Sequence, residues 1–299
     1  MTILKRLTHK RPILLDGATG TELDRRGVNT ALPLWSARAL LEAPAVLQQI
    51  HADYARAGAE VLTANTFRTH RRSLVAAGLG HQAAALTAQA VAVARAAIAE
   101  ARPGRAVYVA GSQAPLEDCY SPELAPSPAE CEAEHAEMAQ HLAAAGVDLI
   151  LVETMNTIRE AVAATRAARA TGLPVLTSFV CRSDHALFSG ERVSDAVRAV
   201  ASLGVAGVLI NCTPSTTIHT PFAELQAAAR AQPARLLVTG LYANIGHTNA
   251  VTGWTNTADV SPLEYARLAT GWLRLGARVI GGCCGTTPAH IAALRVMLD

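Results

Sequence analysis

Three cysteines carry the clearest chemical signal in this 299-residue sequence. Cys283 and Cys284 are adjacent, in the run GGCCG at 281–285, and Cys212 follows a β-rich run further upstream. Adjacent cysteines rarely form a disulfide with each other because the resulting ring is strained. Flanking glycines, however, let the backbone turn tightly enough for both thiols to bind one metal ion. Three thiolates can fill three corners of a tetrahedral site and leave the fourth open, and sulfur ligands in that geometry favour zinc.

Such a site suits thiol chemistry better than hydrolysis. Zinc with three thiolates carries a net charge of about −1, so it activates water poorly. It can still hold an incoming thiol as a nucleophilic thiolate, against a free thiol pKa of about 8.5. Two alternatives remain open: a closed structural site in which Cys181 supplies a fourth sulfur, and buried cysteines without a metal. Cys119 and Cys131 fall in an expected loop and helix, and we assign them no role in the site.

The composition indicates a globular chain. Apolar residues make up 51%, charged residues 17%, and the formal net charge is +2, which argues against disorder and against nucleic acid or an anionic membrane as partner. We expect no apolar stretch near the roughly 20 residues of a membrane span, and the first residues, MTILKRLTHKRPILLDG, hold no signal-peptide core. These features predict a cytoplasmic protein acting on small molecules, in a compartment where thiols stay reduced.

Short β-rich runs alternate with longer alanine-rich helical runs, which predicts parallel βαβ units. Eight such repeats favour one closed (β/α)₈ barrel domain over residues 1–299. An open doubly wound sheet is the structural alternative, but DGATGTEL at 16–23 lacks its G-x-G-x-x-G spacing. The expected strands are Pro12–Leu15, Glu60–Ala64, Ala106–Gly111, Asp148–Glu153, Pro174–Val180, Gly207–Asn211, Leu236–Leu241 and Arg278–Gly281; the main expected helices are Pro44–Ala57, His81–Ala101, Ala129–Ala145, Ile158–Thr171 and Pro262–Leu275.

Polar residues stand at the ends of seven of these strands. In a barrel the carboxyl ends of the strands meet on one face, and that face carries the active site. Residues far apart in sequence are therefore expected to converge there. They are Asp16, Asn65, Thr66, Ser112, Gln113, Glu153, Asn211, Cys212, Tyr242, Asn244, Cys283 and Cys284.

The same motifs resemble those of the homocysteine S-methyltransferase family over nearly the whole chain. They are DGATGTEL at 16–23, LWSARALLEAP at 34–44, IHADYARAGAEVLTANTF at 50–67, VETM at 152–155, NC at 211–212 and GGCCGTTPAHI at 281–291. The resemblance implies a (β/α)₈ barrel that binds zinc through Cys212, Cys283 and Cys284. It also implies that L-homocysteine is the methyl acceptor and methionine the product.

By the same resemblance, two acids hold the amino group of homocysteine. Asp16 and Glu153 match these acids, and the backbone amides of Gly17 and Ala18 are expected near the substrate carboxylate. Two charge-assisted hydrogen bonds to one ammonium would position the thiol over the metal.

The remaining strand-end residues have less specific expected roles. Asn65, Thr66, Phe67 and Tyr242 are expected to face the substrates. Asn211 either orients a zinc ligand from behind or only ends its strand. His290 is expected at a solvated position in the first turn of the last helix.

The methyl donor is predicted from a different part of the resemblance. LWSARALLEAP is similar to members that use S-methylmethionine or, less efficiently, S-adenosylmethionine, so we expect a sulfonium donor. Two segments depart from those members. Asn65–Phe67 reads Asn-Thr-Phe, as in the cobalamin-dependent branch, where S-methylmethionine users often have Ser-Tyr-Gln. YANIGH at 242–247 lacks their Pro-Asn-Ser-Gly-Glu run, and His247 stands in place of the glutamate.

These departures leave three alternatives. Betaine could be the donor, or a methylcorrinoid carried by a partner protein, since this chain has no room for cobalamin or folate domains. A non-catalytic zinc-binding or thiol-binding barrel is the alternative of a different class. A betaine pocket would need an aromatic cage, for which the candidates are Trp35, Phe67, Tyr120, Tyr242 and Trp254.

Overall fold

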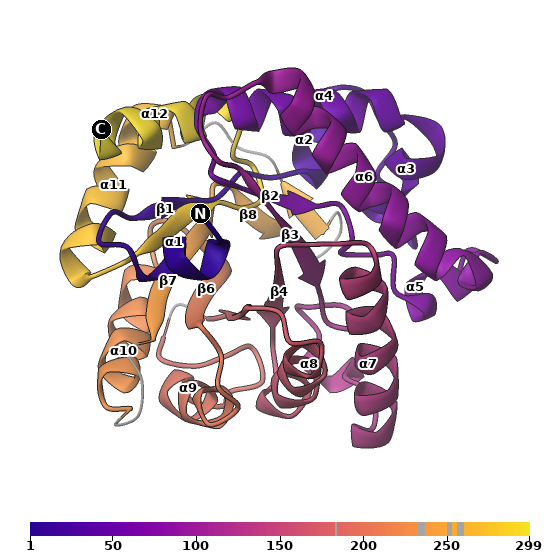
Figure 1. The fold of residues 1–299 in the computed structure, drawn as a ribbon. Helices are drawn as coiled ribbons and strands as arrows, with labels where there is room; N and C mark the ends of the chain where they lie inside the picture. Colours follow the sequence, from indigo (N-terminus) through magenta and orange to yellow (C-terminus); the bar gives the residue numbers. More distant parts are fainter. Residues whose placement is uncertain (183, 233–236, 250–252, 256–259) are drawn as a thin grey trace.

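The computed structural model describes residues 1–182, 184–232, 237–249, 253–255 and 260–299. Its central sheet contains eight parallel strands, β1 (Ile13–Leu14), β2 (Val61–Ala64), β3 (Tyr108–Gln113), β4 (Leu149–Met155), β5 (Val175–Val180), β6 (Gly207–Pro214), β7 (Val238–Asn244) and β10 (Val279–Gly282). Their spatial order is β1-β10-β7-β6-β5-β4-β3-β2. A parallel bridge between Leu15 and Val61 joins β1 to β2 and closes the sheet. The predicted (β/α)₈ barrel is therefore confirmed (Figure 1).

Helices surround the barrel and connect its strands (Figure 1). The helices predicted at Pro44–Ala57 and Pro262–Leu275 have those bounds in the structure. Each begins at a proline, which suits the first helical turn, and ends before a glycine in the left-handed region. The described helices are α1 (Ile3–Thr8), α2 (Gly20–Arg25), α3 (Arg38–Glu42), α4 (Pro44–Ala57), α5 (Arg71–Val75), α6 (Ala83–Ala101), α7 (Pro128–Ala144), α8 (Ile158–Ala170), α9 (Val193–Ala201), α10 (His219–Arg230), α11 (Pro262–Leu275) and α12 (Pro288–Leu298), with short 3₁₀ turns η1 (Trp35–Ala37), η2 (Gly80–Gln82) and η3 (Pro122–Leu124).

All eight predicted strands are present, and their described bounds differ from the prediction by at most three residues. β3 begins and ends two residues later than expected and so includes Ser112 and Gln113. β7 extends to Asn244, while the expected start at Leu236 lies outside the described residues. The loop after β7 also contains an antiparallel hairpin, β8 (His247–Asn249) with β9 (Gly253–Thr255), that the sequence pattern did not predict.

The interior of the barrel changes character along its axis. Apolar side chains such as Leu149, Leu151 and Leu209 fill its lower layers. Side chains two residues further along a strand lie on the same face, so the next interior position on β4 is Glu153 and that on β6 is Asn211. The layer nearest the carboxyl ends is therefore polar, as the strand-end pattern predicted.

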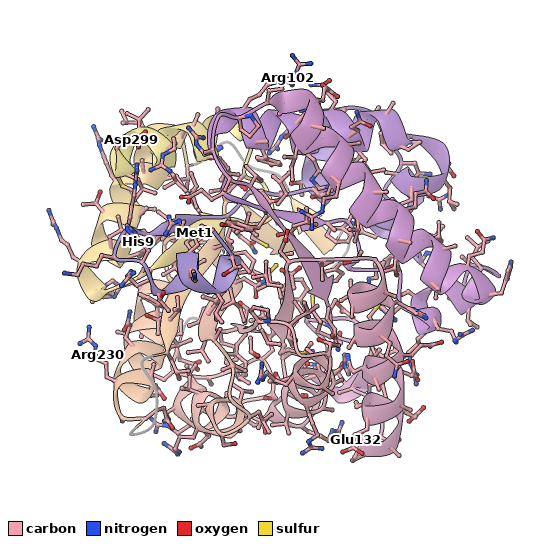
Figure 2. All side chains as sticks on the ribbon, viewed as in Figure 1. Met1, His9, Arg102, Glu132, Arg230 and Asp299 are labelled. Atoms are coloured by element: carbon pink, nitrogen blue, oxygen red, sulfur yellow. The ribbon has the colours of Figure 1, made fainter. Side chains whose placement is uncertain are left out.

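The amino end of the barrel is covered by α1, which crosses it in the centre of Figure 1. Ile3 and Leu7 belong to the same buried cluster as the apolar barrel interior. Met1 lies beside α1 (Figure 2). The hydroxyl of Tyr108 donates to the carbonyl of Met1 at 2.7 Å and fixes the start of the chain at this end. Any small-molecule site built on the barrel must consequently open at the opposite end.

One helical run contradicts the expectation that no apolar stretch approaches the length of a membrane span. Gly80–Ala101 comprises η2 and α6, has 22 residues and a mean hydropathy of 1.2, and is long and apolar enough to cross a membrane by length and composition. The core helix of a globular protein passes the same test. Here α6 packs against α4 and β2 through a buried face that includes Leu86, Ala90 and Ala94.

Candidate metal centre and active site

The thiols of Cys212, Cys283 and Cys284 come together at the carboxyl end of the barrel. Their three Sγ atoms lie within 4.8 Å of one another, and those of Cys212 and Cys283 are 3.0 Å apart. All three are free thiols, with Cys212 buried and the other two half-buried. Within the described ranges, this is the one group of three or more His, Cys, Asp or Glu side chains that could hold a metal ion.

The thiol of Cys212 reaches the site because β6 departs from regular geometry there. Ile210 packs outward and Asn211 inward, so simple alternation would turn Cys212 away from the barrel mouth. Instead the register shifts between Asn211 and Pro214, and Cys212 has φ of +51°, in the left-handed region. Such a conformation costs about 1–3 kcal/mol in a residue with a Cβ, and bulges of this kind re-aim side chains near active sites.

The turn that carries Cys283 and Cys284 is fixed by hydrogen bonds to its carbonyls. Thr286 Oγ1 donates to the carbonyl of Cys283 at 2.7 Å, and the Ile245 amide donates to the carbonyl of Cys284 at 2.9 Å. Gly285 has φ of +85°, and a Cβ there would lie 2.0 Å from the carbonyl oxygen of Ile245. Glycine is therefore required at this position, and it lets two consecutive thiols share one site.

Without a metal, the three thiols share their charge unequally. Hydrogen bonding from Cys283 and then Cys284 lowers the pKa of Cys212 to about 6. The bond to Cys212 raises the pKa values of Cys283 and Cys284 well above the ordinary range. The donor set thus holds one thiolate readily, and a divalent cation would be needed to favour all three.

The donor set fits zinc, judged by its chemistry and spacing. Three sulfurs at about 2.3 Å from one ion suit tetrahedral zinc. The separation of 3.0 Å between Cys212 and Cys283 exceeds a disulfide bond of about 2.05 Å. It falls short of the roughly 3.8 Å edge of that tetrahedron, so a small side-chain rotation is needed.

The structure places Cys181 outside this group of thiols. It follows β5, and its backbone bonds to the Thr213 hydroxyl while burial raises the pKa of its own thiol. A closed site with Cys181 as fourth sulfur is therefore not assembled in this structure. Cys119 and Cys131 are also buried.

Asp16 lies at the same end of the barrel, just after β1. The Thr63 amide donates to its Oδ2 at 2.7 Å and the Thr63 hydroxyl to its Oδ1 at 3.0 Å. Burial raises the pKa of Asp16 to about 8, although both bonds from Thr63 act in the opposite direction and the charge of Glu153 adds to the rise. Asp16 is thus a buried acid that ionises readily only when a cation approaches.

Glu153 is the second acid, at the end of β4. The Ser112 hydroxyl donates to one of its oxygens, and the Tyr242 hydroxyl donates to the other at 2.9 Å. Burial raises the pKa of Glu153 to about 7, against the effect of these two bonds. Tyr242 therefore acts through Glu153, and its hydroxyl is already engaged.

Asn211 joins three neighbouring strands beneath Cys212. Its Oδ1 accepts from the Ser178 hydroxyl at 2.7 Å and from the Thr154 amide at 3.0 Å, and its Nδ2 donates to the Thr154 hydroxyl at 2.8 Å. Thr154 has φ of +61°, beside a register shift in β4. Asn211 thus links the irregular ends of β4 and β6 through its side chain, so its role is more than that of the last residue of a strand.

The turn Asp16–Ala18 is linked directly to the cysteine turn. The Ala18 amide donates to Thr286 Oγ1 at 3.2 Å, so this expected carboxylate ligand already has an acceptor. The buried hydroxyl of Tyr54, on α4, lies 2.8 Å from the carbonyl of Ala18 and 3.2 Å from that of Thr286. A Cβ at Gly17 would lie 2.8 Å from both Thr286 Oγ1 and the Tyr54 ring. Only glycine allows the two turns to pack this closely.

The segment after β2 contributes one half-buried ring and two polar side chains that already have hydrogen-bond partners. Asn65 Nδ2 donates to the carbonyl of Ser36 at 2.8 Å, and the buried Thr66 hydroxyl donates to the carbonyl of Ser112 at 2.8 Å. Phe67 is half-buried and packs edge-on against Trp35, with ring centroids 5.5 Å apart. Of the three, Phe67 is thus placed to present a surface to a ligand.

No specific role was expected for Asn244, and His290 was expected at a solvated position; the structure differs on both residues. Asn244 is the last residue of β7, is buried, and both polar atoms of its amide are without a hydrogen-bond partner in the structure. Its position on the strand, two residues after Tyr242, was the available signal. His290 is buried rather than solvated, because it closes a capping box with Thr287 and its Nε2 lies 3.1 Å from the carbonyl of Val260. The side chains of His247 and Trp254 lie outside the described part of the chain.

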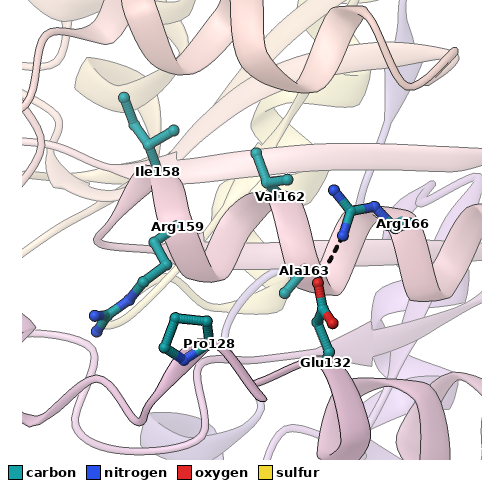
Figure 3. Close-up of a pocket in the computed structure, with 7 residues that line it drawn as sticks. All are labelled: Pro128, Glu132, Ile158, Arg159, Val162, Ala163 and Arg166. Atoms are coloured by element: carbon teal, nitrogen blue, oxygen red, sulfur yellow. Dashed lines mark hydrogen bonds and ion pairs between the residues drawn. The ribbon is translucent and has the colours of Figure 1, made fainter. Parts of the chain in front are cut away.

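An open groove of about 270 Å³ between α7 and α8 lies among the outer helices and shares no residue with these thiols and acids. Its polar residues include Glu132 and Arg166, which form an exposed ion pair at 2.7 Å (Figure 3). The groove belongs to the helical shell of the barrel and holds no side chains capable of thiol chemistry.

The fold and the site define a (β/α)₈-barrel protein whose carboxyl end gathers three thiols and two buried acids. The family model described as Homocysteine S-methyltransferase matches residues 13–298, and the chain belongs to this family of methyltransferases.

Similar proteins agree with that assignment. The chain is 34% identical to the homocysteine S-methyltransferase of Escherichia coli K12, over 98% of this chain and 97% of that protein. It is 30% identical to the homocysteine S-methyltransferase YbgG of Bacillus subtilis 168, over 93% and 92% respectively. The crystal structure of E. coli homocysteine methyltransferase MmuM in its metallated form superposes with a TM-score of 0.83 at 31% identity, covering 98% of both chains.

Proposed function

We propose that this enzyme transfers a methyl group from a sulfonium donor, S-methylmethionine or a related compound, to the thiol of L-homocysteine, using zinc held by Cys212, Cys283 and Cys284. The observation that carries the proposal is the gathering of three free thiols within 4.8 Å beside two buried acids. Thiols and acids in this arrangement can bind the two ends of one amino thiol.

The acids provide the orientation of the acceptor. Asp16 and Glu153 bind the homocysteine ammonium, and each ionises as the cation arrives because burial is the main cause of its raised pKa. Thr63 holds the Asp16 carboxylate from behind, and Ser112 and Tyr242 hold that of Glu153. Fixing the ammonium in this way brings the thiol to the three cysteines, and orientation of that kind is a large part of catalysis.

The reaction itself needs little acid–base assistance. When bound, zinc supplies the positive charge that keeps the homocysteine sulfur as a thiolate near neutral pH. The new bond joins this sulfur to the methyl carbon, the donor's carbon–sulfur bond breaks, and its electron pair returns to the sulfonium sulfur. The products are methionine, a neutral thioether and the proton released by the thiol. A cytoplasmic location completes the proposal, because the free thiols require reducing surroundings.

A donor panel tests the proposal. The zinc-loaded enzyme is given homocysteine with S-methylmethionine, S-adenosylmethionine, betaine or a dimethylsulfonium carboxylate, and methionine formation is measured. We expect S-methylmethionine to be the most efficient. Turnover with betaine alone would replace the sulfonium donor in the proposal, and no turnover with any of the four would point to a protein-bound methyl carrier or to a non-catalytic barrel.

Zinc X-ray absorption tests the binding of homocysteine to the metal independently of any donor, and so remains informative if no donor gives turnover. We expect one zinc with three sulfur neighbours in the free enzyme and four after homocysteine is added. A sulfur count that does not change with homocysteine would refute the acceptor chemistry, whatever the donor.

A further inference from the structure

Two aromatic rings from different loops meet at the carboxyl end of the barrel. Tyr120 follows β3 and Phe188 follows β5, and their ring centroids are 5.4 Å apart at 66°. Both side chains are half-buried, so each keeps part of its surface accessible. In an edge-on pair, each ring uses at most one of its two faces for the other ring.

Asn156, just after β4, holds the two loops in place. Its Nδ2 donates to the carbonyl of Cys119 at 3.1 Å, next to Tyr120, and its own carbonyl accepts from the Ser189 amide at 3.2 Å, next to Phe188. The Tyr120 amide also donates to the Asp118 side chain at 3.2 Å. The two loops that carry the rings are therefore both hydrogen-bonded to Asn156, one through its side chain and the other through its backbone carbonyl.

The Tyr120 ring lies in the electrostatic field of the three thiols. Burial, followed by the charges of Cys212 and of the adjacent Cys119, raises the pKa of Tyr120 well above its ordinary range, and the charges of Cys284 and Cys283 act in the same direction. Tyr120 thus stays neutral beside a site whose own charge is negative. A cation in contact with this ring would also be attracted by negative charge on the thiols.

The other aromatic pair of the site is less suited to a cation. Trp35 and Phe67 also meet edge-on, but the guanidinium carbon of Arg68 lies 5.5 Å from the centroid of the Phe67 ring. That positive charge repels a second cation. Among the residues that the structure describes, no such cation lies over Tyr120.

We propose that Tyr120, held by Phe188 and Asn156, determines donor specificity: its ring binds the positively charged centre of a sulfonium or quaternary ammonium donor and directs the methyl group toward the three thiols. The inference rests on the proposed methyl transfer and adds the residue that recognises the donor's charge. The cysteines and the acids account for the acceptor. The loops that carry Tyr120 and Phe188 would hold the positively charged centre of the donor.

Binding of a cation and of its uncharged isostere tests the proposal without depending on turnover. Choline and 3,3-dimethylbutan-1-ol are titrated by calorimetry into the zinc-loaded enzyme, its Tyr120→Leu variant and its Tyr120→Phe variant. We expect the wild type to prefer choline by about 3- to 30-fold, the range that cation–π attraction supports. Tyr120→Phe keeps the ring and should keep the preference, whereas Tyr120→Leu should reduce it to less than twofold.

The homocysteine KM and the zinc content serve as controls. Both should stay within twofold of wild type in each variant, since Tyr120 touches neither the acids nor the metal ligands in this proposal. An equal affinity of the wild type for the two probes, or a preference that survives Tyr120→Leu, overturns the inference. A wild type that prefers choline yet forms no methionine with any donor refutes the proposed function and leaves this recognition site standing.

A second variant covers the case in which Tyr120→Leu fails to fold. Asn156→Ala removes the amide that holds the Tyr120 loop and leaves the ring itself in place. The preference for choline should then fall by at least threefold, with zinc content unchanged. An unchanged preference in a folded Asn156→Ala protein would show that the rings do not need this arrangement, and would overturn the positioning by Asn156.

Discussion

Removing the hydroxyl of Tyr54 should weaken homocysteine binding while the barrel stays folded. This hydroxyl is fully buried and lies between the carbonyl of Ala18, at 2.8 Å, and that of Thr286, at 3.2 Å. Ala18 belongs to the turn of Asp16, and Thr286 to the turn of the metal-binding cysteines. The Tyr54 hydroxyl therefore holds the two halves of the proposed homocysteine site together.

The magnitude follows from the two carbonyls that Tyr54→Phe leaves without this donor. An unsatisfied buried acceptor costs about 1–3 kcal/mol, while the phenyl ring keeps the packing. If the Ala18 turn moves to relieve this cost, homocysteine binding must restore the turn and loses the same free energy. The homocysteine KM then rises roughly 5- to 150-fold, since 1.4 kcal/mol corresponds to a factor of ten. The donor KM and the zinc content should change less than twofold.

The assay is steady-state kinetics with each substrate varied in turn, together with metal analysis and thermal unfolding. Tyr108→Phe is the matched control, because its hydroxyl also donates to a carbonyl, that of Met1 at 2.7 Å, but at the amino end of the barrel. It should reduce stability by about 1 kcal/mol and leave both KM values unchanged. If Tyr54→Phe behaves like Tyr108→Phe, the hydroxyl serves the fold alone and the reasoning is refuted.

Three further predictions concern the metal and the acids. Cys283→Ala should lose stoichiometric zinc and all methyl transfer while its circular dichroism is unchanged, whereas Cys181→Ala, outside the thiol group, should keep both; retained activity in Cys283→Ala would exclude the proposed site. Chelation should abolish activity without unfolding the barrel, and zinc should restore it; a loss of secondary structure instead would mean that the metal supports the fold. Asp16→Asn should raise the homocysteine KM by roughly 10- to 150-fold through loss of a charge-assisted bond. It should also alter stability with pH: the folded pKa of about 8 exceeds the unfolded 3.8, so the wild type loses stability as pH rises from 4 to 8. Relative to wild type, Asp16→Asn should therefore gain roughly 3–5 kcal/mol over that interval, and parallel unfolding profiles of the two proteins would contradict the assigned ionisation.

The positions of the thiols and acids could be predicted because a barrel converts sequence position into spatial position. The end of each strand reaches the same face, so Asp16, Glu153, Cys212 and Cys283 were expected at that face once eight repeats were recognised. Their residue types then indicated the chemistry. Neither inference required the loops or the helices to be placed accurately.

What the sequence did not predict depends on contacts between segments far apart in the chain. The left-handed backbone of Cys212 carries no glycine to signal it, and it is stabilised by Asn211 reaching across to Thr154. His290 has an ordinary helix-start pattern, and its burial follows from Val260 lying over it. Pairing of Tyr120 with Phe188 depends on the lengths and hydrogen bonds of two loops.

In the proposed reaction, the negative charge of the site explains how the enzyme can bind two cationic substrates and release both products. Two acids and three thiolates attract an ammonium from homocysteine and an onium centre from the donor. Methyl transfer neutralises the donor's centre, so the attraction to the Tyr120 ring and to the thiols ends at the moment of reaction. The acceptor sulfur becomes a thioether in the same step and can no longer be held as an anion. Binding and release therefore depend on the same charges, and the raised pKa values of Asp16 and Glu153 mean that these two acids ionise readily only when a cation approaches them.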